Sequence, residues 1–184
     1  MSYNRHLIER VNMLKNTFVE ALEFATEMHE GQTRKYNGGA YIEHPIAVAD
    51  LVEAYLDEQE TEEEIVITAI QIALLHDTVE DTPATEENLV ERFSKEVAEG
   101  VWYLTKTPSF VGNRAVRKEL CQARLASAPW LIRVIKTFDM MHNATTIEAN
   151  DPKFWIVFKA ETIALLEAMG TTHIWEEQKG TPLV

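Results

Sequence analysis

Apolar residues recur along most of the chain at the spacing of an α-helix rather than in the alternating pattern of a strand. In one segment Ile65, Ala69, Ile72 and His76 stand at i, i+4, i+7 and i+11, so the helix face that carries His76 is expected to point into the core. Together with Gly, Pro and capping signals, the pattern predicts helices at residues 9–29, 43–56, 61–82, 85–93, 95–104, 114–126, 129–148 and 153–168. The segment between Gly170 and Gly180 is left without an assigned structure.

This succession of helices contains no internal repeat, low-complexity segment or domain linker. The sequence therefore predicts one all-α domain spanning residues 1–184, a length that can bury a sizeable core. Cys121 is the only cysteine, which excludes an intramolecular disulfide and fits a reducing compartment. The first 20 residues lack the apolar core of a signal peptide, and no apolar run approaches the roughly 20 residues that span a bilayer. We expect a cytoplasmic protein without a membrane partner.

The end of the predicted 61–82 helix concentrates ionisable residues. An apolar run leads into His76 and Asp77, and a second acidic pair, Glu80 and Asp81, follows three residues later. In a continuous helix Glu80 lies over His76 and Asp81 over Asp77. Burying such groups is costly unless something compensates, and a bound cation is a common compensation. A capped helix end with a solvated Asp is the alternative for the His-Asp pair alone.

Two other stretches offer partners for this cluster. In the predicted 129–148 helix, Asp139, His142, Asn143 and Thr146 form a polar stripe beside apolar positions. An exposed polar face is the alternative for that stripe. His44 lies in the first turn of the predicted 43–56 helix, where an isolated histidine is usually structural or solvated.

Together, two imidazoles and two carboxylates from His44, His76, Asp77 and Asp139 would form a mixed nitrogen and oxygen site. Such a set suits Mn²⁺, Fe²⁺, Co²⁺ or Zn²⁺ better than Ca²⁺ or Mg²⁺. With four protein ligands at most and no thiolate, it leaves positions for water and substrate, as in a catalytic rather than a structural site.

The net charge of −13 argues against nonspecific binding to nucleic acid, because most of the surface would repel a phosphate backbone. It does not exclude a small anionic ligand, since basic residues gather locally at Arg34-Lys35, within residues 106–124 and at Arg133 and Lys136. The alternative for these groups is a solvated face that balances the acidic run at residues 57–64.

Several ordered motifs resemble the HD-domain metal-dependent phosphohydrolases, and within them the hydrolase domain of RelA/SpoT homologues and small alarmone hydrolases. The resemblance covers about residues 18–150. It is carried by residues 29–35 (HEGQTRK), 41–45 (YIEHP), 74–82 (LLHDTVEDT), 93–98 (FSKEVA), 101–106 (VWYLTK) and 136–147 (KTFDMMHNATTI).

The resemblance implies a single HD-domain helical bundle that binds one Mn²⁺ and removes pyrophosphate from the 3′ position of (p)ppGpp, a guanine nucleotide. It places the metal on His44, His76, Asp77 and Asp139, and the catalytic acids at Glu80 and Asp81. Substrate contacts are expected at Arg34, Lys35, Tyr41, Lys136, Asn143 and Thr146. For Lys136, an ion pair with an acidic neighbour is equally compatible, and His142 is expected to orient Asp139. The protein resembles a stand-alone hydrolase, for which a homo-oligomer is compatible.

Departures from the family pattern bear on the substrate rather than on the metal. Met140 and Thr145 stand where the resembling proteins carry arginines, whereas every metal and acidic position is kept. One alternative is therefore an HD-type nucleotidase acting on another phosphorylated nucleotide. A second alternative is a module that binds alarmone without cleaving it, against which the retained Glu80 and Asp81 argue.

Overall fold

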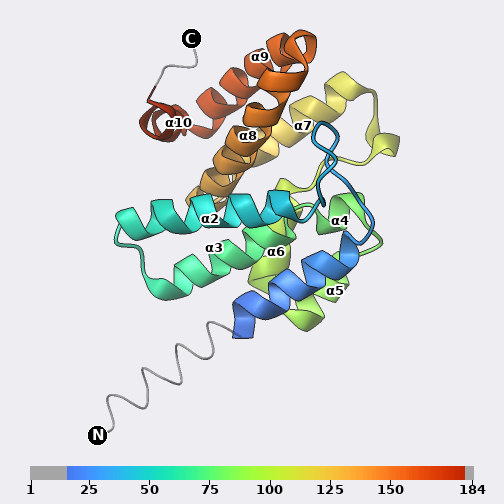
Figure 1. The fold of residues 1–184 in the computed structure, drawn as a ribbon, viewed down its shortest axis with the longest axis vertical. Helices are drawn as coiled ribbons and strands as arrows, with labels where there is room; N and C mark the ends of the chain where they lie inside the picture. Colours follow the sequence, from blue (N-terminus) through green and yellow to red (C-terminus); the bar gives the residue numbers. More distant parts are fainter. Residues whose placement is uncertain (1–15, 181–184) are drawn as a thin grey trace, which may run out of the picture.

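The computed structural model describes residues 16–180, whose regular structure is helical (Figure 1). An isolated bridge between Thr33 and Ala40 is the one β-type pairing in this part of the chain. The all-α prediction is confirmed, although residues 9–15 of the first predicted helix lie outside the described residues. After a helical segment at residues 16–28 come α2 (Glu43–Glu58), α3 (Glu63–Leu75), α4 (Thr78–Asp81), α5 (Glu86–Arg92), α6 (Lys95–Leu104), the 3-10 helix η1 (Ser109–Val111), α7 (Arg114–Ala126), α8 (Trp130–Asn150), α9 (Pro152–Met169) and α10 (Thr172–Lys179).

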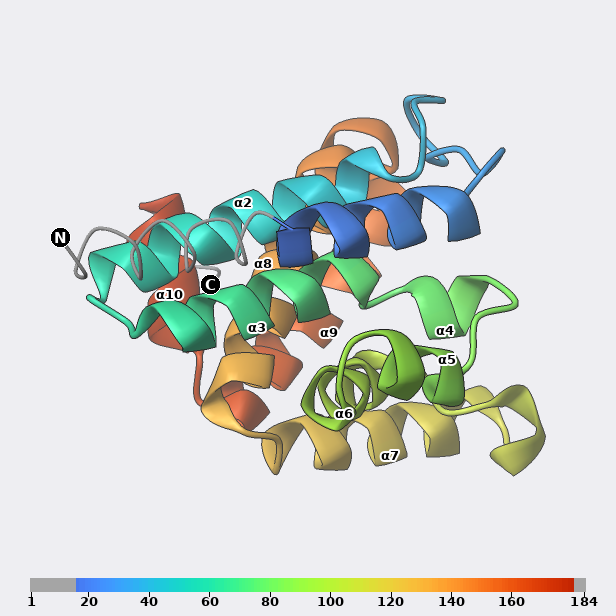
Figure 2. The same cartoon turned by 90° about the horizontal axis from the view of Figure 1, so that it is seen from below.

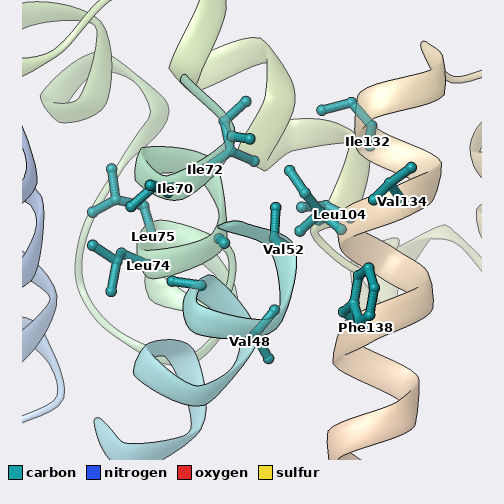
Figure 3. Packing of buried hydrophobic residues seen from close by; sticks show 14 of the residues in the cluster. Val48, Val52, Ile70, Ile72, Leu74, Leu75, Leu104, Ile132, Val134 and Phe138 are labelled. Atoms are coloured by element: carbon teal, nitrogen blue, oxygen red, sulfur yellow. The ribbon is translucent and has the colours of Figure 1, made fainter. Parts of the chain in front are cut away.

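Helix α3 forms the centre of the molecule. Its residues from Ala69 to Leu75 are all buried, as expected for a helix that is covered on every side. Helix α2 runs along α3, and α8 packs against both (Figure 2). Side chains from α2, α3, α6 and α8 meet in one apolar cluster, in which Phe138 of α8 is fully buried (Figure 3). This packing fixes the positions of the three helices that carry the predicted metal ligands.

Gly100 allows α6 to approach α3 closely. A Cβ atom at this position would collide with the side chain of Ile72 and would crowd Ile132 of α8. The absence of a side chain on Gly100 therefore lets three helices share one packing layer.

The prediction of a continuous helix through residues 61–82 is wrong. Helix α3 ends at Leu75, and the separate short helix α4 begins at Thr78. Two side chains satisfy carbonyls at the end of α3: His76 Nδ1 bonds to the Ala73 oxygen at 2.7 Å, and Thr78 Oγ1 donates to the Leu75 oxygen at 2.7 Å. These bonds replace the next turn of the helix, so the chain turns at His76 and Asp77, before the acidic pair of Glu80 and Asp81.

Other boundaries also differ from the sequence prediction. Helix α3 begins only at Glu63, because the backbone N–H of Thr61 closes the end of α2 on the Leu56 oxygen. Ile65 in its first turn is 40% exposed, and Val66 takes the buried position instead. The unassigned segment before Gly180 forms α10.

Two helices begin at side-chain caps at the predicted positions, whereas α3 has no side-chain cap. Thr85 begins α5 with a capping box to Asn88, and the Ser94 hydroxyl begins α6 by accepting from the Val97 N–H. Among the described residues, no helix has the length and apolar character needed to cross a membrane.

Candidate metal centre

Three predicted ligands meet at the centre of the helical packing. His44 comes from the first turn of α2, His76 from the residue that ends α3, and Asp139 from the middle of α8. One ligand atom from each lies within 4.8 Å of the others, and all three side chains are buried. His44 Nε2 lies 3.1 Å from Asp139 Oδ1, and His76 Nε2 lies 3.8 Å from the same oxygen. Ligand atoms at about 2.0–2.2 Å from one shared ion have separations of this order.

Asp77 borders this group from the turn between α3 and α4. Its Oδ2 lies 3.0 Å from His76 Nε2 and 3.6 Å from His44 Nε2. The same oxygen accepts a 2.6 Å hydrogen bond from the Tyr41 hydroxyl. Burial, and then the Asp77 charge, raise the pKa of Tyr41 well above its ordinary value, so the hydroxyl keeps its proton and acts as a donor. Tyr41 was predicted to contact substrate, and the structure shows that its hydroxyl also holds a predicted metal ligand.

The hydrogen bonding of His76 indicates that this centre suits a cation. Its Nδ1 faces the carbonyl oxygen of Ala73, which can only accept, so Nδ1 carries a proton. The buried Nε2 lies 3.0 Å from Asp77 Oδ2: it faces this oxygen with an N–H when His76 is protonated, and it offers a lone pair when His76 is neutral. Two carboxylates face this nitrogen, so the site favours a positive charge, which a proton on His76 or a bound cation can supply. A divalent cation fits this donor set, as it would bind the lone pair and both carboxylates.

The pKa shifts have the same electrostatic origin. Burial opposes a charge on His76, but Asp77 and Asp139 outweigh it and raise the pKa of His76 to about 9. Burial likewise opposes ionisation of Asp139, yet Lys136 and the neighbouring histidines hold its pKa well below the ordinary value. Burial also opposes ionisation of Asp77, but His76 lowers its pKa, so both carboxylates are ionised at neutral pH and available to a cation.

Further contacts orient the ligand side chains. Asn143 donates to Asp139 Oδ1 at 2.7 Å, and Lys136 donates to Asp139 Oδ2 at 2.7 Å. For Lys136, the structure thus shows the ion pair that the sequence left open. The expectation that His142 orients Asp139 is wrong, because His142 Nδ1 lies 2.7 Å from His44 Nδ1 and the two rings stack. The hydrogen bond between these two nitrogens fixes the His44 ring with its Nε2 directed at the carboxylates.

The predicted catalytic acids lie beside the centre on α4. Glu80 accepts from the Lys106 backbone N–H at 2.9 Å and forms an ion pair with the Lys106 ammonium group. Asp81 lies 3.3 Å from the Tyr41 hydroxyl, and burial together with Asp77 and Glu80 raises its pKa. The break between α3 and α4 carries both acids to one end of α3, near the residue 29–42 loop (Figures 1 and 2).

A cavity of about 290 Å³ opens next to the centre and contains most of the predicted substrate contacts. Arg34, Lys35, Tyr41, Asn143 and Thr146 all line it, with Phe154 as a further aromatic wall. Arg34 donates to the Asn143 oxygen at 2.9 Å and lies over the Tyr41 ring. An aromatic and amide-lined cavity of this size can hold a flat heterocycle.

Sequence reasoning missed the supporting role of the 29–35 motif. His29 stacks on the Tyr41 ring with centroids 4.7 Å apart, and it bonds Gln32 at 2.9 Å. Gln32 in turn donates to the Asp81 backbone oxygen at 2.8 Å. The motif was visible in the sequence, but nothing local indicated that its His and Gln would hold Tyr41 and α4.

A family model described as HD domain matches residues 21–154. Among curated proteins, the chain is 32% identical to the bifunctional (p)ppGpp synthase/hydrolase SpoT of Escherichia coli K12, over 94% of this chain and 26% of that protein. It is 36% identical to a guanosine-3′,5′-bis(diphosphate) 3′-pyrophosphohydrolase of Haemophilus influenzae, over 83% of this chain and 22% of that protein. The chain thus spans about a quarter of the length of these relatives.

A solved structure described as a metazoan ortholog of SpoT that hydrolyses ppGpp has the same fold. It superposes with a TM-score of 0.71 at 24% identity, covering 89% of this chain and 96% of the other. At that identity, the comparison establishes the helical architecture.

Proposed function

The chain belongs to the HD-domain family, and from that premise we propose that it is a metal-dependent 3′-pyrophosphohydrolase acting on (p)ppGpp. The observation that carries the proposal is the buried cluster in which His44, His76 and Asp139 each place a ligand atom within 4.8 Å of the others. The choice of (p)ppGpp as substrate follows the names of the relatives that are described as hydrolases.

In this proposal His44, His76, Asp77 and Asp139 hold one divalent ion, for which Mn²⁺ is our choice. The donor set also suits Fe²⁺, Co²⁺ or Zn²⁺. When bound, such an ion provides Lewis acidity that lowers the pKa of water it contacts and offsets charge on phosphate oxygens. Tyr41 holds Asp77 in place, while Asn143 and Lys136 hold the two oxygens of Asp139.

In this proposal, Glu80 and Asp81 carry out the proton transfers. Hydrolysis adds water across the bond between the 3′ oxygen and phosphorus, so the water loses a proton and the departing oxygen gains one. Glu80 can accept the water proton, and its contacts with the Lys106 ammonium group and backbone N–H hold its carboxylate in place. Asp81, on the same helix and 3.3 Å from the Tyr41 hydroxyl, is our choice for returning a proton to the departing oxygen. Arg34, Tyr41 and Asn143 line the cavity in which we place the guanine base.

We further propose that residues 1–184 form one domain and act in the cytoplasm. The family match over residues 21–154 and the shared core of α2, α3, α6 and α8 support a single unit. The lone Cys121 supports a reducing compartment.

Glu80→Gln tests the proton transfer directly. The amide keeps the size of the side chain but cannot act as a base, so turnover of ppGpp should fall by about 10²–10⁴-fold with metal affinity retained. Thr85→Ala, at the cap of α5, serves as a control for general disturbance of this region. Unchanged turnover in Glu80→Gln would contradict the assignment of Glu80.

A further inference from the structure

A second cavity, of about 400 Å³, lies between α6, α7, α8 and α9. Two of its lining residues contact acidic side chains at or beside the metal centre. Lys136 lines the second cavity and bonds Asp139 Oδ2, whereas Asn143 lines the first cavity and bonds Asp139 Oδ1. Lys106 also lines the second cavity and pairs with Glu80. Each oxygen of Asp139 is therefore bonded by a residue that lines a different cavity.

The second cavity carries an unusual charge for this acidic chain. Six cationic side chains line it against a single carboxylate, Glu161, in a protein of net charge −13. Arg114 and Lys118 share that carboxylate, at 3.2 Å and 3.0 Å. Arg117 and Arg124 donate to the carbonyl oxygens of Gly112 and Thr105, which carry no net charge. Lys106 and Lys136 pair with Glu80 and Asp139, so the positive charge that no carboxylate offsets lies on the α7 side of the cavity.

The apolar residues of the lining strengthen the attraction between the cations and an anion in the cavity. Leu125, Phe158 and Leu165 form an apolar part of the wall, which lowers the local dielectric constant and strengthens charge interactions. Met140, which stands where the resembling family has an arginine, also lines this cavity. The cations of α7 therefore provide positive charge on the side where the chain has lost that arginine.

We infer that this cavity binds the phosphate groups at the uncleaved end of the substrate, with Arg114 and Lys118 of α7 as specificity-determining residues. The inference rests on the proposed function, in which the 3′ diphosphate lies at the metal centre and the base in the Arg34 cavity. A nucleotide phosphorylated at two positions then occupies both cavities at once, and the 5′ phosphates face α7.

Binding of inorganic tripolyphosphate in the presence of EDTA tests the cavity without relying on turnover. We expect the double variant Arg114→Gln/Lys118→Gln to bind about tenfold more weakly than the unchanged protein, because two charge-assisted contacts are lost. Added salt should weaken binding to the unchanged protein more than to this variant. The control, Lys95→Gln/Lys153→Gln, removes the same charge from exposed positions outside the cavity lining and should bind normally. Equal affinity in all three proteins would overturn the inference.

Turnover then tests whether the substrate uses the cavity. Three guanosine 3′-diphosphates that carry a hydroxyl, one phosphate or two phosphates at the 5′ position are compared at saturating Mn²⁺. We expect kcat/KM to rise about tenfold across this series for the unchanged protein and for the control, and to stay nearly flat for Arg114→Gln/Lys118→Gln. An undiminished rise in that variant would overturn the inference while leaving the proposed function intact. Failure of every protein to release pyrophosphate would contradict the proposed function, and tripolyphosphate binding would still decide whether the cavity takes phosphate.

Discussion

Replacing Tyr41 with phenylalanine separates two roles for this residue. The sequence resemblance places Tyr41 among the substrate contacts, whereas the structure directs its hydroxyl to Asp77 Oδ2 at 2.6 Å. Tyr41→Phe removes that donor but keeps the ring that stacks on His29. The variant should therefore fold normally and lose mainly the orientation of Asp77.

The expected loss follows from the geometry of this bond. A hydrogen bond to a charged carboxylate contributes about 1.5–3 kcal/mol. The Asp77 side chain is 17% exposed, so water replaces part of the lost bond, and we take the lower end of that range. A change of about 1.4 kcal/mol corresponds to a tenfold weaker affinity for Mn²⁺, at the lower end of the 10–100-fold effects typical of residues that orient metal ligands.

Calorimetric titration with Mn²⁺ measures this effect, and Tyr36→Phe provides the control. Tyr36 lines the same cavity, but its hydroxyl contacts Asp151, away from the metal centre. We expect weaker Mn²⁺ binding only in Tyr41→Phe, with a normal KM for ppGpp once Mn²⁺ is saturating. Normal Mn²⁺ affinity with a raised KM would refute the reasoning and return Tyr41 to the substrate contacts.

Two further predictions concern stability. Gly100→Leu should lower the free energy of unfolding by about 1–3 kcal/mol, because the new side chain must displace Ile72 and Ile132. Urea unfolding measures this, with the exposed neighbour variant Glu99→Leu as the control, and equal stability of the two variants would contradict the close approach of α6 to α3. Mn²⁺ at about 100 times its Kd should stabilise the protein by about 2.7 kcal/mol relative to an EDTA-treated sample; calorimetric unfolding checks this, and the gain should vanish in His76→Ala.

Local signals explain why much of the fold could be predicted from the sequence. The N-caps at Thr85 and Ser94 depend on atoms three residues away, so the sequence contains everything needed to place them. The buried stretch of α3 and the polar stripe of α8 follow from helical spacing in the same way. The grouping of His44, His76 and Asp139 was expected from these patterns together with the family resemblance.

The remaining features depend on contacts between distant segments. The end of α3 at Leu75 requires His76 and Thr78 to turn their side chains back onto carbonyls, which the apolar pattern does not reveal. His142 meets His44 rather than Asp139 because of how α8 is rotated against α2, a property of the packing. The pairing of Lys106 with Glu80 likewise joins two separate helix ends.

Pyrophosphate release from ppGpp, measured with added Mn²⁺, with EDTA and with the Asp77→Ala variant, tests the central claim most directly. We predict release of pyrophosphate and GDP that requires both Mn²⁺ and Asp77. A folded, Mn²⁺-loaded protein that leaves ppGpp intact but hydrolyses another phosphorylated nucleotide would contradict the proposed substrate. Release that continues unchanged in EDTA or in Asp77→Ala would contradict the metal centre itself.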